Sequence, residues 1–265
     1  MIAADNIGSH QWFLKSCVDS LSSIADLYNS HTYSFGYESK NSEVINWEAN
    51  NVDIVSPSKK MHFIGEFGSN KVLNAARQSD IDSYERGVLL CRLAIDFLNA
   101  GATGVSYWSL DDHYTNAESN YANMQQLGLW RYINSVYSSE KFYSEETEDY
   151  YARPQYYAYS LMTRFVRKGD EVYPLEMKDD FVSGIALHHS DGTWSYLFAN
   201  GSNNNLSVRL RSVRQKGSTL DIFEYRRDGL PTGGKQIFRS YTLRHKRNGG
   251  FNLYIPSKSV ILLNE

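Results

Sequence analysis

Apolar and polar positions alternate in two different ways along the first 110 residues. Over residues 10–28 apolar side chains return every three or four positions, which predicts a helix with Ser9 as its N-cap. Residues 80–99 show the clearest helical period, with apolar residues on one face and an acidic first turn that suits the helix dipole. A weaker helix is expected around Val44–Trp47.

Short apolar runs lie between these helices, and each run is closed by polar residues. The runs are Leu27–Tyr33, Met61–Gly68 and Val105–Leu110, and the chain opens on Met1–Asp5, which has the pattern of a strand end. Strands that alternate with helices favour parallel βα units. We therefore expect the first part of the chain to form a parallel α/β sheet.

The pattern changes after Gly169, where short alternating runs follow one another at regular spacing. These runs are Phe181–His188, Trp194–Phe198, Leu206–Leu210, Leu220–Tyr225, Phe251–Ile255 and Val260–Leu263. Turns rich in glycine and asparagine separate them, a pattern typical of an antiparallel β-sandwich. We therefore expect two domains, residues 1–168 and residues 169–265. A long polar segment, 111–153, and a helix begun by Pro154 complete the first domain.

Composition narrows the class of protein. The chain of 265 residues is 14% aromatic, which excludes intrinsic disorder, and its net charge of −3 argues against a nucleic-acid partner. No apolar run is long enough for a membrane span, and the opening residues lack the pattern of a signal peptide. Cys17 and Cys91 lie within helical patterns and are expected in the core. The sequence has no CxxC motif and no Cys/His cluster, so we expect no metal site, and no cofactor is implied. The oligomeric state is left open.

Polar side chains gather where successive strands end. His31 and Tyr33 close one strand, and Glu66 closes the next strand between two glycines. In parallel α/β barrels, chemistry is placed at the carboxyl ends of the strands. A carboxylate between small residues can face a substrate closely, and a tyrosine hydroxyl can keep it ionised by donating a hydrogen bond. His31, Tyr33 and Glu66 are therefore the candidate catalytic residues.

Trp108 closes the following strand and offers a flat apolar face of the kind that stacks on a sugar ring. Asp111 and Tyr114 come after it and are candidate substrate-binding residues, although Asp111 and its neighbour Asp112 also fit a role as loop or capping carboxylates. Each residue alone has a structural explanation, such as a satisfied histidine or a core tryptophan. Their order on successive strand ends favours a polysaccharide site.

Several motifs extend this pattern into a family resemblance. They are His31-x-Tyr33, Ile64-Gly-Glu66-Phe-Gly68, Gly104-Val-Ser-Tyr-Trp108-Ser, Arg153-Pro-x-Tyr-Tyr157 and Ile255-Pro-x-x-Ser259-Val-Ile-Leu. The set resembles strands six, seven and eight of clan A glycoside hydrolases, close in style to the cellulase-like family 5 and to family 39, with their trailing sandwich. The resemblance implies an α/β plus all-β fold: the C-terminal part of a TIM (β/α)8 barrel, about strands five to eight, followed by an antiparallel β-sandwich.

The resemblance also implies a chemistry. Glu66 would be the nucleophile of a retaining double displacement on β-glycosidic bonds of a polysaccharide or oligosaccharide. Tyr33 would orient and ionise Glu66, His31 would contact the sugar or the acid, and Trp108 would form the floor of the sugar subsite. The partner would be a glycan, without nucleic acid, membrane or cofactor, and an extracellular or periplasmic location is expected.

One element of the family pattern is missing. The acid/base of the clan is a glutamate after an asparagine at the end of strand four, and the only Asn-Glu pair here is Asn264-Glu265. Two hypotheses account for this: a fragment of a longer retaining glycosidase, or a natural half-barrel without hydrolytic activity. The functional alternatives are a glycoside hydrolase whose present chain is inactive by itself, a non-catalytic carbohydrate-binding protein and a purely structural surface module.

Overall fold

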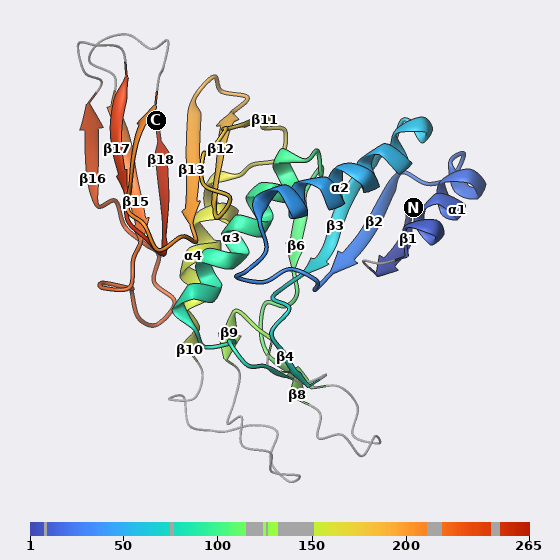
Figure 1. Cartoon of the computed structure of the whole chain (residues 1–265), viewed down its shortest axis with the longest axis horizontal. Helices are drawn as coiled ribbons and strands as arrows, with labels where there is room; N and C mark the ends of the chain where they lie inside the picture. The colour runs from blue at the N-terminus through green and yellow to red at the C-terminus, as the bar shows by residue number, and fades with distance from the viewer. Residues whose placement is uncertain are drawn as a thin grey trace.

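The first part of the protein is a parallel α/β sheet. The computed structural model describes residues 1–7, 10–74, 77–114, 124–125, 127–131, 151–210, 219–244 and 250–265. Four parallel strands pair in the order β1 (Ile2–Ile7), β2 (Leu27–Thr32), β3 (Met61–Phe67) and β6 (Val105–Tyr107). Helices α1 (Gln11–Leu21), α2 (Asn41–Val55) and α3 (Tyr84–Asn99) connect these strands (Figure 1). The alternation of strand and helix predicted from the sequence is confirmed.

Helix α1 is shorter than the sequence pattern predicts. It ends at Leu21 rather than at residue 28, and it buries Leu14, Cys17 and Val18 against β1 and β2. Ile24 matches the helical spacing, yet the residue is 59% exposed and lies in the turn before β2. The apolar spacing of the sequence therefore continues past the end of the helix into the turn. The expected N-cap, Ser9, lies outside the described residues.

After α4 (Pro154–Phe165) the chain becomes antiparallel. Six strands form one sheet in the order β11 (Glu171–Pro174), β12 (Val182–His188), β13 (Trp194–Asn200), β18 (Ser259–Asn264), β15 (Thr219–Tyr225) and β16 (Tyr241–Arg244). Strands β14 (Leu206–Leu210) and β17 (Phe251–Ile255) form a second sheet, and side chains of both sheets share one apolar cluster. The sequence pattern missed β11 and β16, because both strands are mostly exposed and show no alternation.

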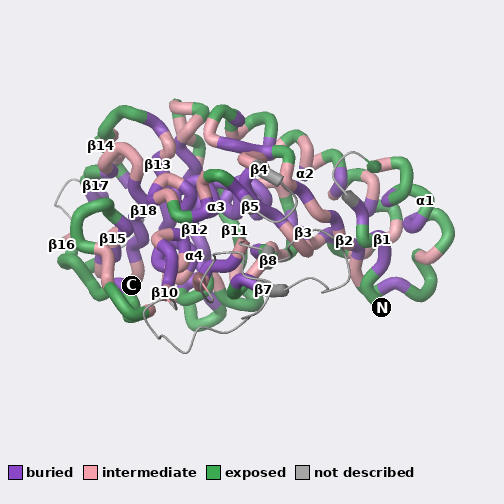
Figure 2. The backbone as a smooth tube through the Cα atoms, turned by 90° about the horizontal axis from the view of Figure 1, so that it is seen from below, coloured by how far each residue is buried: buried purple, intermediate pink, exposed green. Residues whose placement is uncertain are grey.

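Helix α3 lies between the two sheet systems and is buried on nearly every side (Figures 1 and 2). Together with α4 it joins the parallel sheet to one face of the six-stranded sheet in a continuous core. Along β12, Ile185 and Leu187 face this core, whereas Ala186 faces β14 and β17. The sequence pattern places apolar residues of α3 on one face only; the structure corrects this, because a helix covered on both sides has no solvent face.

Short strands lie beyond the carboxyl ends of the parallel strands. Where the segment 111–153 is described, it forms β7 (His113–Tyr114), β8 (Met124–Gln125), β9 (Trp130–Arg131) and β10 (Tyr151–Ala152). In Figure 1 most of these, with β4 (Val72–Asn74), gather below the parallel sheet; β4 pairs with β5 (Arg77–Gln78). None of the helices in the described part of the chain is both long and apolar enough to cross a membrane.

Asp96 of α3 is a carboxyl group buried at the contact between α3 and β12. The residue is 1% exposed, and its Oδ2 has no hydrogen-bond partner among the described residues. Burial raises the pKa of Asp96 to about 7, although Ser183 and Arg92 act in the opposite direction. An unfolded aspartate titrates near pH 4. The folded protein therefore binds more protons than the unfolded chain between about pH 4 and pH 7.

The stability that Asp96 contributes is fully present below about pH 4 and is lost as the pH rises through about 7. We expect Asp96→Asn to unfold less readily than the parent at pH 8, by up to about 4 kcal/mol, and to lose that advantage at pH 4. Urea unfolding at the two pH values measures both differences. Equal free energies of unfolding at pH 8 would contradict a buried carboxylate with a raised pKa.

Candidate active site

The carboxyl ends of β2 and β3 bring the three candidate catalytic residues together. His31 is the penultimate residue of β2, Tyr33 follows that strand, and Glu66 is the penultimate residue of β3. The parallel register sets His31 opposite Glu66, with Gly65 as an extra residue in β3. These side chains, called the candidate trio below, therefore meet at one edge of the sheet.

Glu66 is held by two neighbours. The Tyr33 hydroxyl donates a hydrogen bond to Glu66 Oε2 at 3.0 Å, and His31 Nδ1 lies 3.5 Å from Glu66 Oε1. The Glu66 side chain is 25% exposed, so the carboxylate can be reached although most of its surroundings are protein. A carboxylate that is oriented through both oxygens and still accessible can act as a nucleophile or as a base.

Tyr33 is a permanent hydrogen-bond donor in this arrangement. Burial, and after it the charge of Glu66, raise the pKa of the Tyr33 hydroxyl above its usual range. The hydroxyl therefore keeps its proton at physiological pH and remains able to donate its hydrogen bond to Glu66. The structure thus brings Tyr33 into contact with Glu66, while the role that the sequence pattern proposes for Tyr33 stays a prediction.

Gly65 and Gly68, on either side of Glu66 in the sequence, make room for the side chains of two residues that line the site. A Cβ on Gly65 would lie 2.2 Å from Asn29 Oδ1, and a Cβ on Gly68 would lie 2.9 Å from Tyr33 Cε1. The backbone of neither glycine has the positive φ that other glycines of the chain adopt. The sequence interpretation, in which small residues admit a substrate, is therefore incomplete, because these glycines admit Asn29 and Tyr33.

We expect Gly65→Ala to displace the Asn29 amide and to lower the free energy of unfolding by about 1–3 kcal/mol, the usual effect of overpacking. The double variant Asn29→Ala/Gly65→Ala removes the clash and is expected to recover much of that loss. Chemical denaturation of the parent, both single variants and the double variant measures the coupling. Strictly additive effects would show that the two positions do not compete for this space.

The candidate substrate-binding residues lie on the segment that follows β6. Trp108 comes directly after the strand, and the residue is 38% exposed, so it can contact a ligand. Asp111 is exposed. Its backbone forms a parallel bridge to Trp130 and accepts a hydrogen bond from the Ser109 hydroxyl at 2.6 Å, and these contacts do not involve the candidate trio. Tyr114 lies in β7, and its side chain is outside the described residues.

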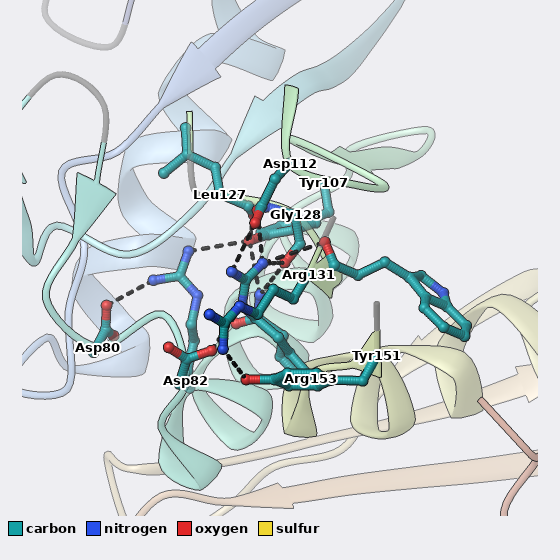
Figure 3. A network of polar contacts seen from close by, with 12 residues as sticks. Asp80, Asp82, Tyr107, Asp112, Leu127, Gly128, Arg131, Tyr151 and Arg153 are labelled. Atoms are coloured by element: carbon teal, nitrogen blue, oxygen red, sulfur yellow. Dashed lines mark hydrogen bonds and ion pairs between the residues drawn. The ribbon is translucent and has the colours of Figure 1, made fainter. Parts of the chain in front are cut away.

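A buried arginine fixes the segment that carries Trp108 (Figure 3). Arg153 donates to both carboxylate oxygens of Asp112, at 2.7 and 2.8 Å, and to the Gly128 carbonyl at 2.8 Å. The Asp112 and Arg153 side chains are 0% and 1% exposed, and Arg153 Nε lies 2.8 Å from Asp82. Burial lowers the pKa of Arg153, but Asp112 and Asp82 raise it overall, so the guanidinium stays charged.

Asp112 is therefore a structural carboxylate, which was one of the two explanations that the sequence left open. In the sequence, Arg153 stands out only as the residue before the proline that begins a helix, and its partner Asp112 lies 41 positions away. A contact over that separation depends on tertiary packing and leaves no periodic signal in the sequence. The available signal was chemical: Asp112 follows the end of a strand, and an arginine such as Arg153 is a suitable partner for a carboxylate there.

Asp5 and Asn29 are two further polar residues at the candidate trio that the sequence analysis missed. Asp5 Oδ1 lies 2.7 Å from His31 Nε2, and it accepts a hydrogen bond from Asn29 Nδ2 at 3.0 Å. The available signal was position, because Asp5 lies near the end of β1 as His31 and Glu66 do in β2 and β3. Within the described ranges, no group of three or more His, Cys, Asp or Glu side chains is arranged to hold a metal ion.

Comparisons with known protein families and with curated proteins give no match for this chain. Solved structures share its fold. A GH30 endoxylanase from Clostridium papyrosolvens C71 matches with a TM-score of 0.66 and 11% identity, over 99% of this chain and 55% of the other. A GH51 arabinofuranosidase from Xanthomonas axonopodis pv. citri matches with a TM-score of 0.63 and 12% identity, over 99% and 57%. A GH39 β-xylosidase from Caulobacter crescentus matches with a TM-score of 0.57 and 17% identity, over 99% and 56%.

These similarities show that the chain has the fold of clan A glycoside hydrolases. The chain spans little more than half the length of each of those three structures. Another structure with this fold is described as a conserved exported protein from Bacteroides fragilis. The fold that the motif resemblance implies is supported by these glycoside hydrolase structures, whereas membership of the clan and assignment to the cellulase-like family stay predictions.

Proposed function

We propose that this chain carries the nucleophile of a retaining glycoside hydrolase that acts on β-glycosidic bonds of a polysaccharide or oligosaccharide. The observation that carries the proposal is the hydrogen bond from Tyr33 to Glu66, with His31 beside the other carboxylate oxygen. The three residues lie at the carboxyl ends of parallel strands, where barrel enzymes place their chemistry. The glycoside hydrolase fold of the similar structures supports the same reaction class.

In the proposed reaction Glu66 attacks the anomeric carbon and forms a glycosyl ester. The glycosidic C–O bond breaks, and its electron pair leaves with the aglycone oxygen, which takes a proton from a carboxylic acid about 5–5.5 Å from the nucleophile. Water then hydrolyses the ester. Tyr33 holds the carboxylate in line during the attack, and Trp108 supplies an apolar surface for the sugar ring.

We assign β1, β2, β3 and β6 to strands five to eight of a (β/α)8 barrel, and we begin the sandwich at residue 169. The parallel order with helical connections supports this assignment. A groove of about 360 Å³ between β6 and α4, lined by Val105, Leu110 and Tyr159 among others, lies along β6. On this assignment the acid/base glutamate belongs to strand four, outside these 265 residues, and the chain alone does not hydrolyse ordinary glycosides.

A non-catalytic carbohydrate-binding protein is the second candidate. The exposed ring of Trp108 favours it, because stacking on a sugar requires no acid/base residue. Both candidates imply a glycan partner. Both also fit the extracellular or periplasmic location implied by the resemblance, which similarity to a protein described as exported supports. The two functions differ in whether Glu66 forms a bond to the sugar.

A mechanism-based probe tests the nucleophile in the absence of the acid/base residue. In a 2-deoxy-2-fluoroglycosyl fluoride, the fluoride ion leaves without protonation, and the fluorine at C2 slows hydrolysis of the ester, so the adduct accumulates. We expect the chain to gain the mass of one fluorosugar, located on Glu66 by peptide mass spectrometry. Glu176→Gln changes an exposed glutamate far along the chain and is expected to label like the parent.

The test is carried out with the xylosyl, glucosyl and arabinosyl forms of the probe, because the sugar that the site accepts is not fixed by the proposal. Glycan binding without an adduct would favour the carbohydrate-binding alternative. An adduct on a carboxylate other than Glu66 would remove Glu66 from the role of nucleophile. A chain that neither labels nor binds glycans would contradict both candidates.

A further inference from the structure

Strand β1 contains a bulge beside the candidate trio. Its register to β2 pairs Ala3 with Tyr28 and Asn6 with Ser30, so Ala4 and Asp5 together lie opposite Asn29. Ala4 has a φ of +59°, a backbone conformation that residues other than glycine seldom adopt. A bulge inserts one residue and turns a neighbouring side chain towards a new direction. The side chain that this bulge turns is that of Asp5.

The turned carboxylate lies against the imidazole of His31. Asp5 Oδ1 is 2.7 Å from His31 Nε2, a distance at which a protonated Nε2 donates a hydrogen bond to the carboxylate, and Asn29 Nδ2 lies 3.3 Å from the same nitrogen. The Asn29 amide donates to the same oxygen at 3.0 Å, and Gly65 leaves the space in which that amide lies. The other ring nitrogen, Nδ1, faces Glu66 Oε1 at 3.5 Å.

We propose that Asp5 is a positioning residue of the candidate active site, acting through His31. Asp5, His31 and Glu66 form one polar line across the neighbouring strands β1, β2 and β3. By holding the Nε2 proton, Asp5 fixes the ring orientation and keeps Nδ1 directed at Glu66. Carboxylate partners fix histidine rings in this way in metal sites and catalytic triads. The inference rests on the proposed role of Glu66 as nucleophile.

Fold stability does not explain the arrangement. The Asp5 side chain is 76% exposed, and exposed ion pairs contribute little to stability. The positive φ of Ala4 lowers the stability of the fold. Such strained residues persist where the surrounding structure or a function requires them. The contact between Asp5 and His31 is too weak to explain the strain at Ala4 by stability. The strain is explained if this contact orients His31.

Two readouts on Asp5→Ala test the proposal. The labelling rate constant of Glu66 with the 2-deoxy-2-fluoroglycosyl fluoride is expected to fall about 10- to 100-fold, as when other partners of functional histidines are removed. The second readout is the nitrogen-15 NMR spectrum of the His31 imidazole, whose signals are assigned by their absence in His31→Gln. In Asp5→Ala we expect the signal of the Nε2–H form, present in the parent, to be lost. Asp5→Asn keeps an acceptor oxygen and is expected to recover part of both.

The matched control is Asp19→Ala, because Asp19 is an exposed aspartate of α1 that pairs only with Lys15 in the described contacts. It is expected to leave the labelling rate and the His31 spectrum unchanged. A parental labelling rate in Asp5→Ala, or an unchanged His31 spectrum, would overturn the positioning role. If the parent itself does not label, the role of Glu66 is wrong, and the His31 spectrum alone then decides whether Asp5 orients the ring.

Discussion

Glu66→Gln is expected to form no detectable fluorosugar adduct, with a labelling rate at least ~10⁴-fold below that of the parent, as removal of a nucleophile generally causes. The amide keeps the shape of the side chain, and the Tyr33 hydroxyl at 3.0 Å can still donate to its oxygen. Glutamine, however, lacks the charge needed to attack the anomeric carbon. Glycan binding, followed by Trp fluorescence, is expected to stay near the parental level.

Labelling and binding together separate the nucleophile from general damage to the site. Glu176→Gln makes the same chemical change at an exposed position and is expected to behave as the parent in both assays. Labelling of Glu66→Gln at the parental rate would show that another group attacks the probe. Loss of binding together with labelling would show that the variant disturbs the site and not the chemistry alone.

Arg153→Met is expected to lower the free energy of unfolding by about 3–5 kcal/mol, because it leaves a buried carboxylate without its counter-charge. The Asp112 side chain is 0% exposed and receives two hydrogen bonds from this guanidinium. The same arginine also binds the Gly128 carbonyl, so the segment that carries Trp108 loses an anchor. Chemical denaturation measures the stability, and glycan titration measures the effect on Trp108.

Arg167→Met provides the matched control for this buried pair. Arg167 faces Asp191 at 3.3 Å, but the two side chains are 48% and 55% exposed, so the loss is expected to stay below about 1 kcal/mol. The double variant Asp112→Asn/Arg153→Met neutralises the abandoned carboxylate and is expected to recover a large part of the stability. Equal losses in Arg153→Met and Arg167→Met would contradict the buried ion pair as the cause.

Several features of the fold are local enough to be predicted. The strands β2, β3, β12 and β13 and the helix begun by Pro154 follow from periods of two and of three to four residues, which depend only on neighbouring positions. Errors occur where the local pattern and the burial disagree. The exposed Ile24 extends the period of α1, and the exposed strand β11 shows no period.

The sequence by itself determined which residues meet at the candidate trio. Strands that run parallel present their carboxyl ends at one edge, so His31, Tyr33 and Glu66 meet whenever the βα alternation is correct. The tertiary structure alone decided how the trio is supported. Asp5 reaches His31 through a bulge, Gly65 admits the Asn29 amide, and the remaining contacts cross long stretches of chain.

The physical reason is separation along the chain. Asn29 and Asp5 are 24 positions apart, and Arg153 and Asp112 are 41 apart. Contacts over such separations depend on strand register, on a single inserted residue and on the packing of one layer against another. Helix α3 shows the same limit, since its sequence marks one apolar face, while burial on its other faces arises only when the antiparallel sheet covers it.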